Sequence, residues 1–344
     1  MSDKPSRTLK VVCFGEVLLR LAAPDHQLLL QTPQLCVHIG GAEANVAVSL
    51  AQLGHEVVMA SVLPESPLGK ACLGELRRHG VDTAGIRTAP GRVGLYFLTV
   101  GAGHRPSQVL YDREASAFAL APPDLIDWDT VFGGAGWFHL SGVTPALGRR
   151  TADSAVRAVR HARAHGLRVS FDCNYRAKLW ESWRGEAPSI LREIVSEAEL
   201  LFAQEKDIEL ILGRDYSATP APGRFQQAAE EMLAAFPRLV QVASTVREAR
   251  SVDSAALSGV SCSRDGLCRT RTYSIERIVD RIGSGDAFAA GLLHGLKSGL
   301  SQAAALDFGA AAACLKHSIP GDFNLSSAED VQSLLDDAGF AVRR

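Results

Sequence analysis

The sequence predicts a three-layer α/β/α sandwich with a mostly parallel central sheet and a small β lid. Three observations lead to this fold class. Short β-branched runs alternate with segments of helical apolar spacing along most of the 344 residues. Repeated strand, helix, strand units favour a parallel sheet with right-handed crossovers and helices on both faces. Two segments, about residues 17–39 and 92–117, break this alternation, and we interpret them as a lid over the ligand-binding edge of the sheet.

The N-terminal part begins with a strand and continues into two helices. LKVVCFGE is a β-branched run that stops at Gly15. Ala44, Val48 and Ala51 share one stripe of a helix that Gly54 closes as a C-terminal cap. The expected elements are a strand within 9–16, a helix at 42–53, a strand at 56–62, a helix at 67–80 and two lid strands within 93–100 and 107–114.

After the lid the alternation resumes and continues almost to the end of the chain. The same criteria predict strands at 136–142, 167–172, 199–203, 238–243, 256–260 and 269–274, and helices at 149–166, 187–198, 205–213, 225–236, 286–297 and 301–316. No internal repeat, low-complexity tract or linker divides the sequence. We therefore expect residues 1–344 to form a single domain.

The composition argues against several classes of protein. The 36 basic and 38 acidic residues give a formal net charge of -2, which offers no field to collect nucleic acid or an anionic membrane. No apolar run approaches the roughly 20 residues that span a bilayer. The first ten residues lack the apolar core of a signal peptide, and the seven cysteines are scattered without a CxxC pair. We expect a cytoplasmic protein with reduced thiols and no membrane or nucleic-acid partner.

The segment VDRIGSGDAFAAGLLHGL, residues 279–296, places a glycine-rich turn at the start of a helix. Unpaired amides at a helix N-terminus bind an anion, and glycines let the backbone approach it closely. A carboxylate at Asp286 can take the proton of a hydroxyl while those amides hold the charge of a transferred phosphoryl group. The alternative is structural: Gly283 and Gly285 form a turn and Asp286 caps the helix. A GxxxxGK[ST] P-loop and a GxGxxG dinucleotide motif are both absent.

Two motifs together resemble the ribokinase-like (pfkB) family of sugar kinases. GGAEANVAVSLAQLG, residues 40–54, looks like the family's N-terminal GG-x-x-x-N pattern. Its C-terminal pattern D-T-x-G-A-G-D-x-F is matched at Asp280, Gly283, Gly285, Asp286 and Phe288. The resemblance implies a ribokinase-like fold, a small-molecule sugar substrate, and the cofactors ATP and Mg²⁺. It also implies that Asp286 is the general base and that the Gly283, Ser284 and Gly285 amides form the anion hole.

Within the family, four segments resemble the branch that phosphorylates the sugar acid 2-keto-3-deoxygluconate. They are RVGLYFLTVGAGHRPSQVLYDREASAF, FDCNYRAKLW, VDRIGSGDAF and KHSIPGDFN. The resemblance assigns substrate contacts to Gly40, Gly41, Ala42, Tyr96, Tyr111, Arg113, Asp286 and Asp322, and places Asn174 and Arg176 between sugar and triphosphate. Arg113 is expected to bind the carboxylate of the sugar acid, because a planar guanidinium matches a carboxylate in two hydrogen bonds. Arg176 is expected to balance charge on the transferred group together with Mg²⁺.

The chain leaves the family pattern on the nucleotide side. Many members carry an N-x-x-E pair where this chain has Gln204 and Asp207, which implies a nucleotide contact for Gln204 and a water-mediated metal contact for Asp207. The usual T-x-G-x-x-G turn is replaced by ASTVREARSV, residues 243–252, which has no glycine. Arg281 stands where a threonine is frequent, and Ser284 replaces the usual alanine.

The expected reaction is ATP-dependent phosphorylation of 2-keto-3-deoxy-D-gluconate at its 6-hydroxyl. Alternatives are a kinase for another sugar, such as fructose or 2-keto-3-deoxygalactonate, and, in a different class, a catalytically weak sugar-acid binding protein or sensor. The exposed edges of a β lid also favour a homo-oligomer. His161 and His165 form an HxxxH pair, which we interpret as surface residues because the HExxH glutamate is missing.

Overall fold

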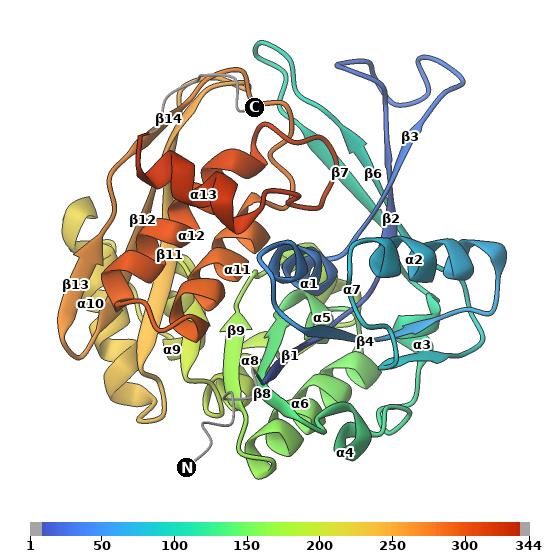
Figure 1. The fold of residues 1–344 in the computed structure, drawn as a ribbon, viewed down its shortest axis with the longest axis horizontal. Coiled ribbons are helices and arrows are strands. Elements are labelled where there is room, and N and C mark those ends of the chain that lie inside the picture. Colours follow the sequence, from blue (N-terminus) through green and yellow to red (C-terminus); the bar gives the residue numbers. More distant parts are fainter. Residues whose placement is uncertain (1–8, 338–344) are drawn as a thin grey trace, which may run out of the picture.

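A ten-stranded sheet runs through the middle of the molecule (Figure 1), and the computed structural model describes residues 9–337. Its strands are β1 (Lys10–Phe14), β4 (Val57–Leu63), β5 (Ile86–Thr88), β8 (Ala135–Ser141), β9 (Arg168–Asp172), β10 (Leu200–Phe202), β11 (Gln241–Ala249), β12 (Ala255–Ser263), β13 (Gly266–Arg269) and β14 (Tyr273–Ile275). They lie in the order β13-β12-β11-β10-β9-β8-β1-β4-β5, with β14 paired to β12. Neighbours from β11 to β5 are parallel, and β12 is antiparallel to its three partners.

Helices cover both faces of this sheet. They are α1 (Ala42–Gln52), α2 (Pro67–Arg78), α3 (Ala117–Leu120), α4 (Trp128–Val131), α5 (Val143–Ala146), α6 (Arg149–Ala164), α7 (Ala177–Ser182), α8 (Ala187–Val195), α9 (Glu205–Leu212), α10 (Ala221–Ala235), α11 (Ser284–Lys297), α12 (Gln302–Lys316) and α13 (Ala328–Leu335). No helix within residues 9–337 combines the length and apolar character needed to cross a bilayer.

The side chains of β1 alternate between two separate cores. Val12 and Phe14 pack on the side of α3 to α10, whereas Val11 and Cys13 pack on the side of α1, α2, α11 and α12. This alternation is the period-two pattern of a strand that is buried on both faces. The predicted three-layer α/β/α sandwich with a mostly parallel sheet is therefore confirmed.

The two segments that interrupt the alternation form a separate four-stranded sheet. Its strands are β2 (Leu18–Ala22), β3 (Cys36–Gly40), β6 (Gly94–Thr99) and β7 (Gln108–Asp112), in the order β3-β2-β6-β7. β2 and β6 are parallel, and the outer pairs are antiparallel. Figure 1 shows this sheet projecting from the main body beside α1. That this sheet closes over the ligand-binding edge as a lid stays a prediction. That residues 1–344 form a single domain also stays a prediction.

Some elements differ from the sequence-based expectation. The strand expected at 238–243 is β11, which continues to Ala249 as an antiparallel partner of β12. The strand expected at 269–274 is divided between β13 and β14. A further helix, α13, follows the two closing helices, and Val331 packs it against α12.

Candidate active site

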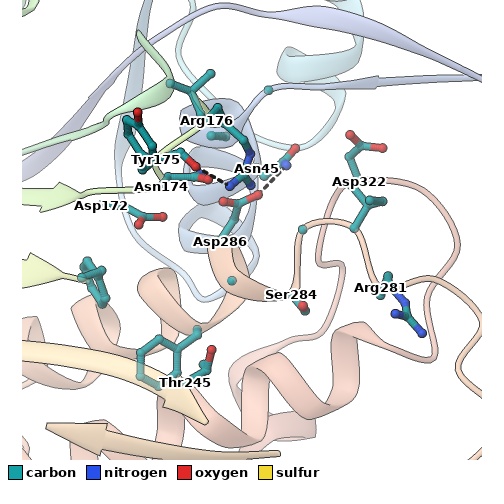
Figure 2. Close-up of a pocket in the computed structure, with 18 of the residues that line it drawn as sticks. Asn45, Asp172, Asn174, Tyr175, Arg176, Thr245, Arg281, Ser284, Asp286 and Asp322 are labelled. Atoms are coloured by element: carbon teal, nitrogen blue, oxygen red, sulfur yellow. Dashed lines mark hydrogen bonds between the residues drawn. The ribbon is translucent and has the colours of Figure 1, made fainter. Parts of the chain in front are cut away.

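A cavity of about 710 Å³ lies where the carboxyl ends of the central strands face the second sheet (Figure 2). Asp172 and Phe202 end β9 and β10 at its floor, and Tyr96 and Tyr111 line it from β6 and β7. The N-terminus of α11 forms a further wall. This is the edge at which parallel α/β sheets bind ligands.

The glycine-rich start of α11 has close contacts at Gly283, the residue before the helix, and open space at Gly285, in its first turn. Gly283 has a φ of 79°, and a Cβ there would lie 2.0 Å from the Asp322 carbonyl oxygen. A Cβ on Gly285 would meet nothing within 4 Å, although Gly285 lines the cavity. The Ser284 amide already makes a long hydrogen bond of 3.4 Å to the Arg281 carbonyl. The Gly285 and Asp286 amides, in the first turn of α11, have no acceptor within the helix.

Asp286 is buried on the first turn of α11, beside this turn. Its carboxylate accepts a 2.6 Å hydrogen bond from Nδ2 of Asn45, as Figure 2 shows. Burial raises the pKa of Asp286 to about 7, and the nearby Glu43 and Asp322 charges add to this effect. The Asn45 hydrogen bond and the Arg176 charge act in the opposite direction. The result is a carboxylate that takes up and releases a proton near neutral pH.

Asp322 lies against the Gly283 turn and lines the cavity as part of a buried network. The Tyr96 hydroxyl donates to its Oδ2 at 2.7 Å, and the Arg20 Nε lies 3.1 Å from its Oδ1. Burial raises the pKa of Asp322, and the Arg20 charge opposes the rise. A Cβ on Gly40 would lie 2.4 Å from the same carboxylate. Gly40 is not among the residues that line the cavity, its missing side chain makes room for Asp322, which does line it, and its expected contact with the sugar stays a prediction.

Arg113 occupies the side of the cavity formed by the second sheet, near Tyr111. It is 8% exposed, and its Nε donates to Oε2 of the buried Glu16 at 2.7 Å. This bond fixes the plane of the guanidinium while Arg113 still lines the cavity. The expected Gly41 and Ala42 also line the cavity, and a Cβ on Gly41 would lie 2.1 Å from the Glu16 carbonyl oxygen.

Asn174 and Arg176 follow β9 and reach the same cavity. Asn174 has a φ of 37°, in the left-handed region that asparagine tolerates better than most residues. Arg176 is exposed and precedes α7, and Figure 2 shows its guanidinium directed toward Asp286. Its positive charge lowers the pKa of Asp286 and of Asp172, against the larger effect of their burial.

Acidic side chains gather at the floor of the cavity. Burial raises the pKa of Asp172 well above its usual range, and the Asp286 and Asp207 charges raise it further. The Asp207 carboxylate accepts a 2.8 Å hydrogen bond from the backbone N–H of Gln204 at the start of α9. Burial raises the pKa of Asp207 as well. Within residues 9–337 no three His, Cys, Asp or Glu side chains are arranged as a ligand set for a metal ion. His165, of the HxxxH pair, instead pairs with Asp129 at 3.2 Å.

Several cavity residues were not singled out from the sequence. Asn45 is the asparagine of the GGAEAN segment, so the GG-x-x-x-N pattern already pointed to it as a candidate. Asp172 directly precedes the CNYR residues and carried a weaker signal. Thr245 and Arg247 line the cavity from the extended end of β11. Arg281, which the sequence had already marked as a departure from the family pattern, lines it from the segment before α11. For Thr245 and Arg247, the only sign in the sequence was the absence of glycine from residues 243–252.

Comparison with known proteins gives a consistent result. The profile described as pfkB family carbohydrate kinase matches residues 8–326. The 2-dehydro-3-deoxygalactonokinase of Haloferax volcanii is 33% identical over 95% of this chain and 97% of its own length. The 2-dehydro-3-deoxygluconokinase of Bacillus subtilis is 29% identical over 95% of each chain. The crystal structure of 2-dehydro-3-deoxygluconokinase from Thermotoga maritima is 40% identical, with a TM-score of 0.90 over 95% of this chain and 99% of that one.

Proposed function

The chain belongs to the pfkB family of carbohydrate kinases, and from this premise we propose that it transfers the γ-phosphoryl group of ATP to the 6-hydroxyl of 2-keto-3-deoxy-D-gluconate. One observation carries the proposal. A buried carboxylate, Asp286, lies at an amide-lined helix start, in the same cavity as a fixed guanidinium, Arg113. The first feature suits phosphoryl transfer, and the second suits an acidic sugar.

Asp286 acts as the general base in this proposal. Its pKa of about 7 lies near neutral pH, and a general base removes a hydroxyl proton most effectively when its pKa is close to the pH at which the reaction runs. The proton passes from the sugar hydroxyl to the carboxylate while the hydroxyl oxygen attacks the terminal phosphorus. The bond between that phosphorus and the oxygen bridging to the β-phosphate breaks, and ADP leaves. The amides of Gly283, Ser284 and Gly285 hold the charge on the transferred group, the Gly285 amide most directly. Arg176 adds a positive charge on the side of Asp286 that faces away from these amides.

The residues present fit a nucleotide with Mg²⁺. Asp172 and Asp207 are acidic groups whose pKa values are raised by burial, and a bound cation would offset the cost of their charges. Gly285 leaves open space at the helix start, where a phosphate can approach the backbone. Asp172 and Asp207 would hold the ion, in part through water, and Asn174 and Gln204 would contact the nucleotide. When bound, Mg²⁺ supplies charge neutralisation between the phosphates.

The preference for a sugar acid rests on Arg113 and its surroundings. Glu16 engages the Nε of Arg113, so the terminal nitrogens of the fork remain to bind a carboxylate. Tyr96, Tyr111 and Asp322 are polar groups on the same part of the cavity wall, suited to hydroxyl groups of the sugar. A neutral ketose would leave these terminal nitrogens without a carboxylate to bind and should bind less well.

A substrate panel tests this proposal. Turnover with ATP and Mg²⁺ is compared for 2-keto-3-deoxygluconate, 2-keto-3-deoxygalactonate and fructose, because the relatives include kinases named for both epimeric acids. We expect kcat/KM to be highest for 2-keto-3-deoxygluconate and lowest for fructose. Preferred turnover of the galacto epimer would correct the stereochemistry, and preferred turnover of fructose would overturn the sugar-acid assignment. Binding of the acids without turnover would favour a sensor.

A further inference from the structure

Two arginines that line the cavity, Arg247 and Arg281, have no acidic partner within residues 9–337. We use "donor side" for the wall formed by Thr245, Arg247, Arg281 and Ser284. Figure 2 shows Thr245, Ser284 and Arg281 on the opposite side of Asp286 from Asn174 and Arg176. In the described part of the chain, Arg247 donates to a serine hydroxyl and an imidazole nitrogen, and Arg281 donates to a backbone carbonyl. None of these acceptors carries a formal negative charge.

The orientation of Arg247 is fixed by two groups. Its Nη2 donates to the Ser284 hydroxyl at 3.0 Å and also contacts Nε2 of His317. Nδ1 of His317 lies 2.7 Å from the Ala313 carbonyl, so it carries the proton and leaves Nε2 as an acceptor. Burial and the Arg247 charge lower the pKa of His317 to about 4, which keeps the ring neutral. Arg247 is thereby held at the first residue of α11.

Arg281 brings a second positive charge to the same wall. Its guanidinium donates to the Val252 carbonyl in the loop after β11. Partial burial lowers the pKa of Arg247, and the Arg281 charge lowers it further, so the two groups repel each other. Two neighbouring guanidinium groups beside the positive end of a helix form a site for a multiply charged anion. In a kinase cavity, the anion of that kind is the phosphate chain of the donor.

The backbone of the same segment cannot take over this role. Residues 243–249 run as an extended strand paired with β12, from Ala243 opposite Ser261 to Ala249 opposite Ala255. Successive amides of a strand point in opposite directions, whereas a phosphate nest requires successive amides that converge. The T-x-G-x-x-G turn of the family is absent from residues 243–252, so side chains must supply the positive groups on the donor side.

We propose that Arg247 and Arg281 bind the phosphates that remain with the nucleotide after transfer, and that His317 positions Arg247. This inference rests on the proposed kinase function. It explains how a donor site whose residues 243–252 lack glycine can still hold a nucleotide. The two guanidinium groups take the place of the backbone amides that a T-x-G-x-x-G turn would supply. Affinity for the donor then depends strongly on ionic strength, since it arises from full charges.

The test compares Arg247→Gln, Arg281→Gln and the matched control Arg250→Gln. Arg250 lies at the end of the same hairpin and contacts Ser274 and Glu276 instead of the cavity. We expect the first two variants to raise KM for ATP about tenfold or more, with kcat at saturating ATP and KM for the sugar acid changed less than about threefold. Arg247→Lys should recover part of the loss, because it keeps the charge without the fork. The control should match the unaltered protein.

A direct binding measurement separates this inference from the kinase assignment. Calorimetric titration with ATP and with inorganic tripolyphosphate, without any sugar, should show weaker binding and a shallower salt dependence in both variants. If no sugar in the panel is phosphorylated but these differences appear, the proposed function fails and the inference stands. If the variants bind both anions as tightly as the control, the inference is overturned. The positioning role of His317 requires that His317→Phe raise KM for ATP and leave KM for the sugar unchanged.

Discussion

Asp286 lies where catalysis and stability make opposite demands. A base must be deprotonated, yet burial raises the pKa of this carboxyl to about 7. The folded protein therefore holds a proton here more tightly than the unfolded chain, in which the carboxyl has its ordinary pKa. Between the ordinary carboxyl pKa and pH 7 the native state binds more protons, so this group makes folding less favourable as the pH rises. Its charged form is tolerated because Asn45 donates to it.

The variant Asp286→Asn should separate the two demands. At about pH 8 the free energy of unfolding should increase by up to a few kcal/mol, because a neutral amide removes the cost of a buried charge, about 1.4 kcal/mol per pKa unit. The gain should shrink at about pH 5, where the native carboxyl is protonated. Turnover should fall about 100-fold or more. Urea unfolding at both pH values and a steady-state assay measure these effects; unchanged stability and turnover at pH 8 would refute both roles.

Gly283 and Gly285 are glycines for different reasons, and alanine substitution should reveal this. Gly283→Ala places a Cβ 2.0 Å from the Asp322 carbonyl oxygen at a positive φ, so the melting temperature and turnover should both fall. Gly285→Ala meets no protein atom within 4 Å and favours helix, so the protein should melt at the same or a higher temperature. Its turnover should still fall, because the methyl group occupies space that a phosphate needs. A fully active Gly285→Ala variant would contradict the anion-hole assignment.

At the scale of elements, the sequence predicted regular periodicity well and partner-dependent structure poorly. The strands and helices with clear apolar spacing were found close to their observed bounds. The extension of β11 to Ala249 depends on pairing with β12, and a polar segment such as ASTVREARSV gives no local sign of that pairing. The start of α13 did carry a local signal: the Ser327 hydroxyl accepts from the Asp330 amide, and the Asp330 carboxylate accepts from the Ser327 amide.

Arg20 connects the second sheet to the turn that precedes α11. From β2 its Nη2 donates to Asp280 at 2.7 Å, and its Nε lies 3.1 Å from Asp322. Its guanidinium is buried, and so is its Asp322 partner. Removing one partner of a buried pair leaves uncompensated charge in the interior, which costs more than the loss of an exposed pair.

The variant Arg20→Met should therefore lower the free energy of unfolding by about 3 kcal/mol. The control is Arg92→Met, which removes an exposed ion pair with Asp112 and should cost less than about 1 kcal/mol. Chemical unfolding at neutral pH measures both. Because Asp322 loses its counter-charge, KM for the sugar should also rise in the first variant. Equal stability losses in the two variants would show that the buried pairs of Arg20 do not stabilise the link between the second sheet and the turn before α11.

At the scale of the whole molecule, the fold class was predictable and the assembly of the site only in part. Strand and helix periodicity determined the three layers, and the GSGD and NYR motifs identified two walls of the cavity. The contacts between Arg113 and Glu16 and between Arg20 and Asp280 join residues 97 and 260 positions apart. Such contacts follow from the packing of the second sheet on the first, which no local pattern encodes. Arg113 was therefore found as a candidate without its partner.

The outer face of the second sheet carries an apolar row across all four strands. Leu21 is paired with Val37 on one side and with Phe97 on the other, and Phe97 is paired with Leu110. Val37 and Leu110 are each 59% exposed. Tyr96 and Tyr111, their neighbours along β6 and β7, point to the opposite face and line the cavity. One face thus serves the site, and the other presents apolar surface next to open strand edges.

We expect this row to pair with the same row of a second copy, since a two-fold dimer places one surface patch against its own copy and would bury these apolar side chains. Leu110→Glu should then reduce the mass measured by sedimentation velocity from that of two chains to that of one, because two like charges would face each other in the interface. The control is Leu68→Glu on α2, an apolar residue that is 53% exposed but lies outside the row. It should leave the mass unchanged. A monomeric unaltered protein, or equal effects of both variants, would rule out pairing through this sheet.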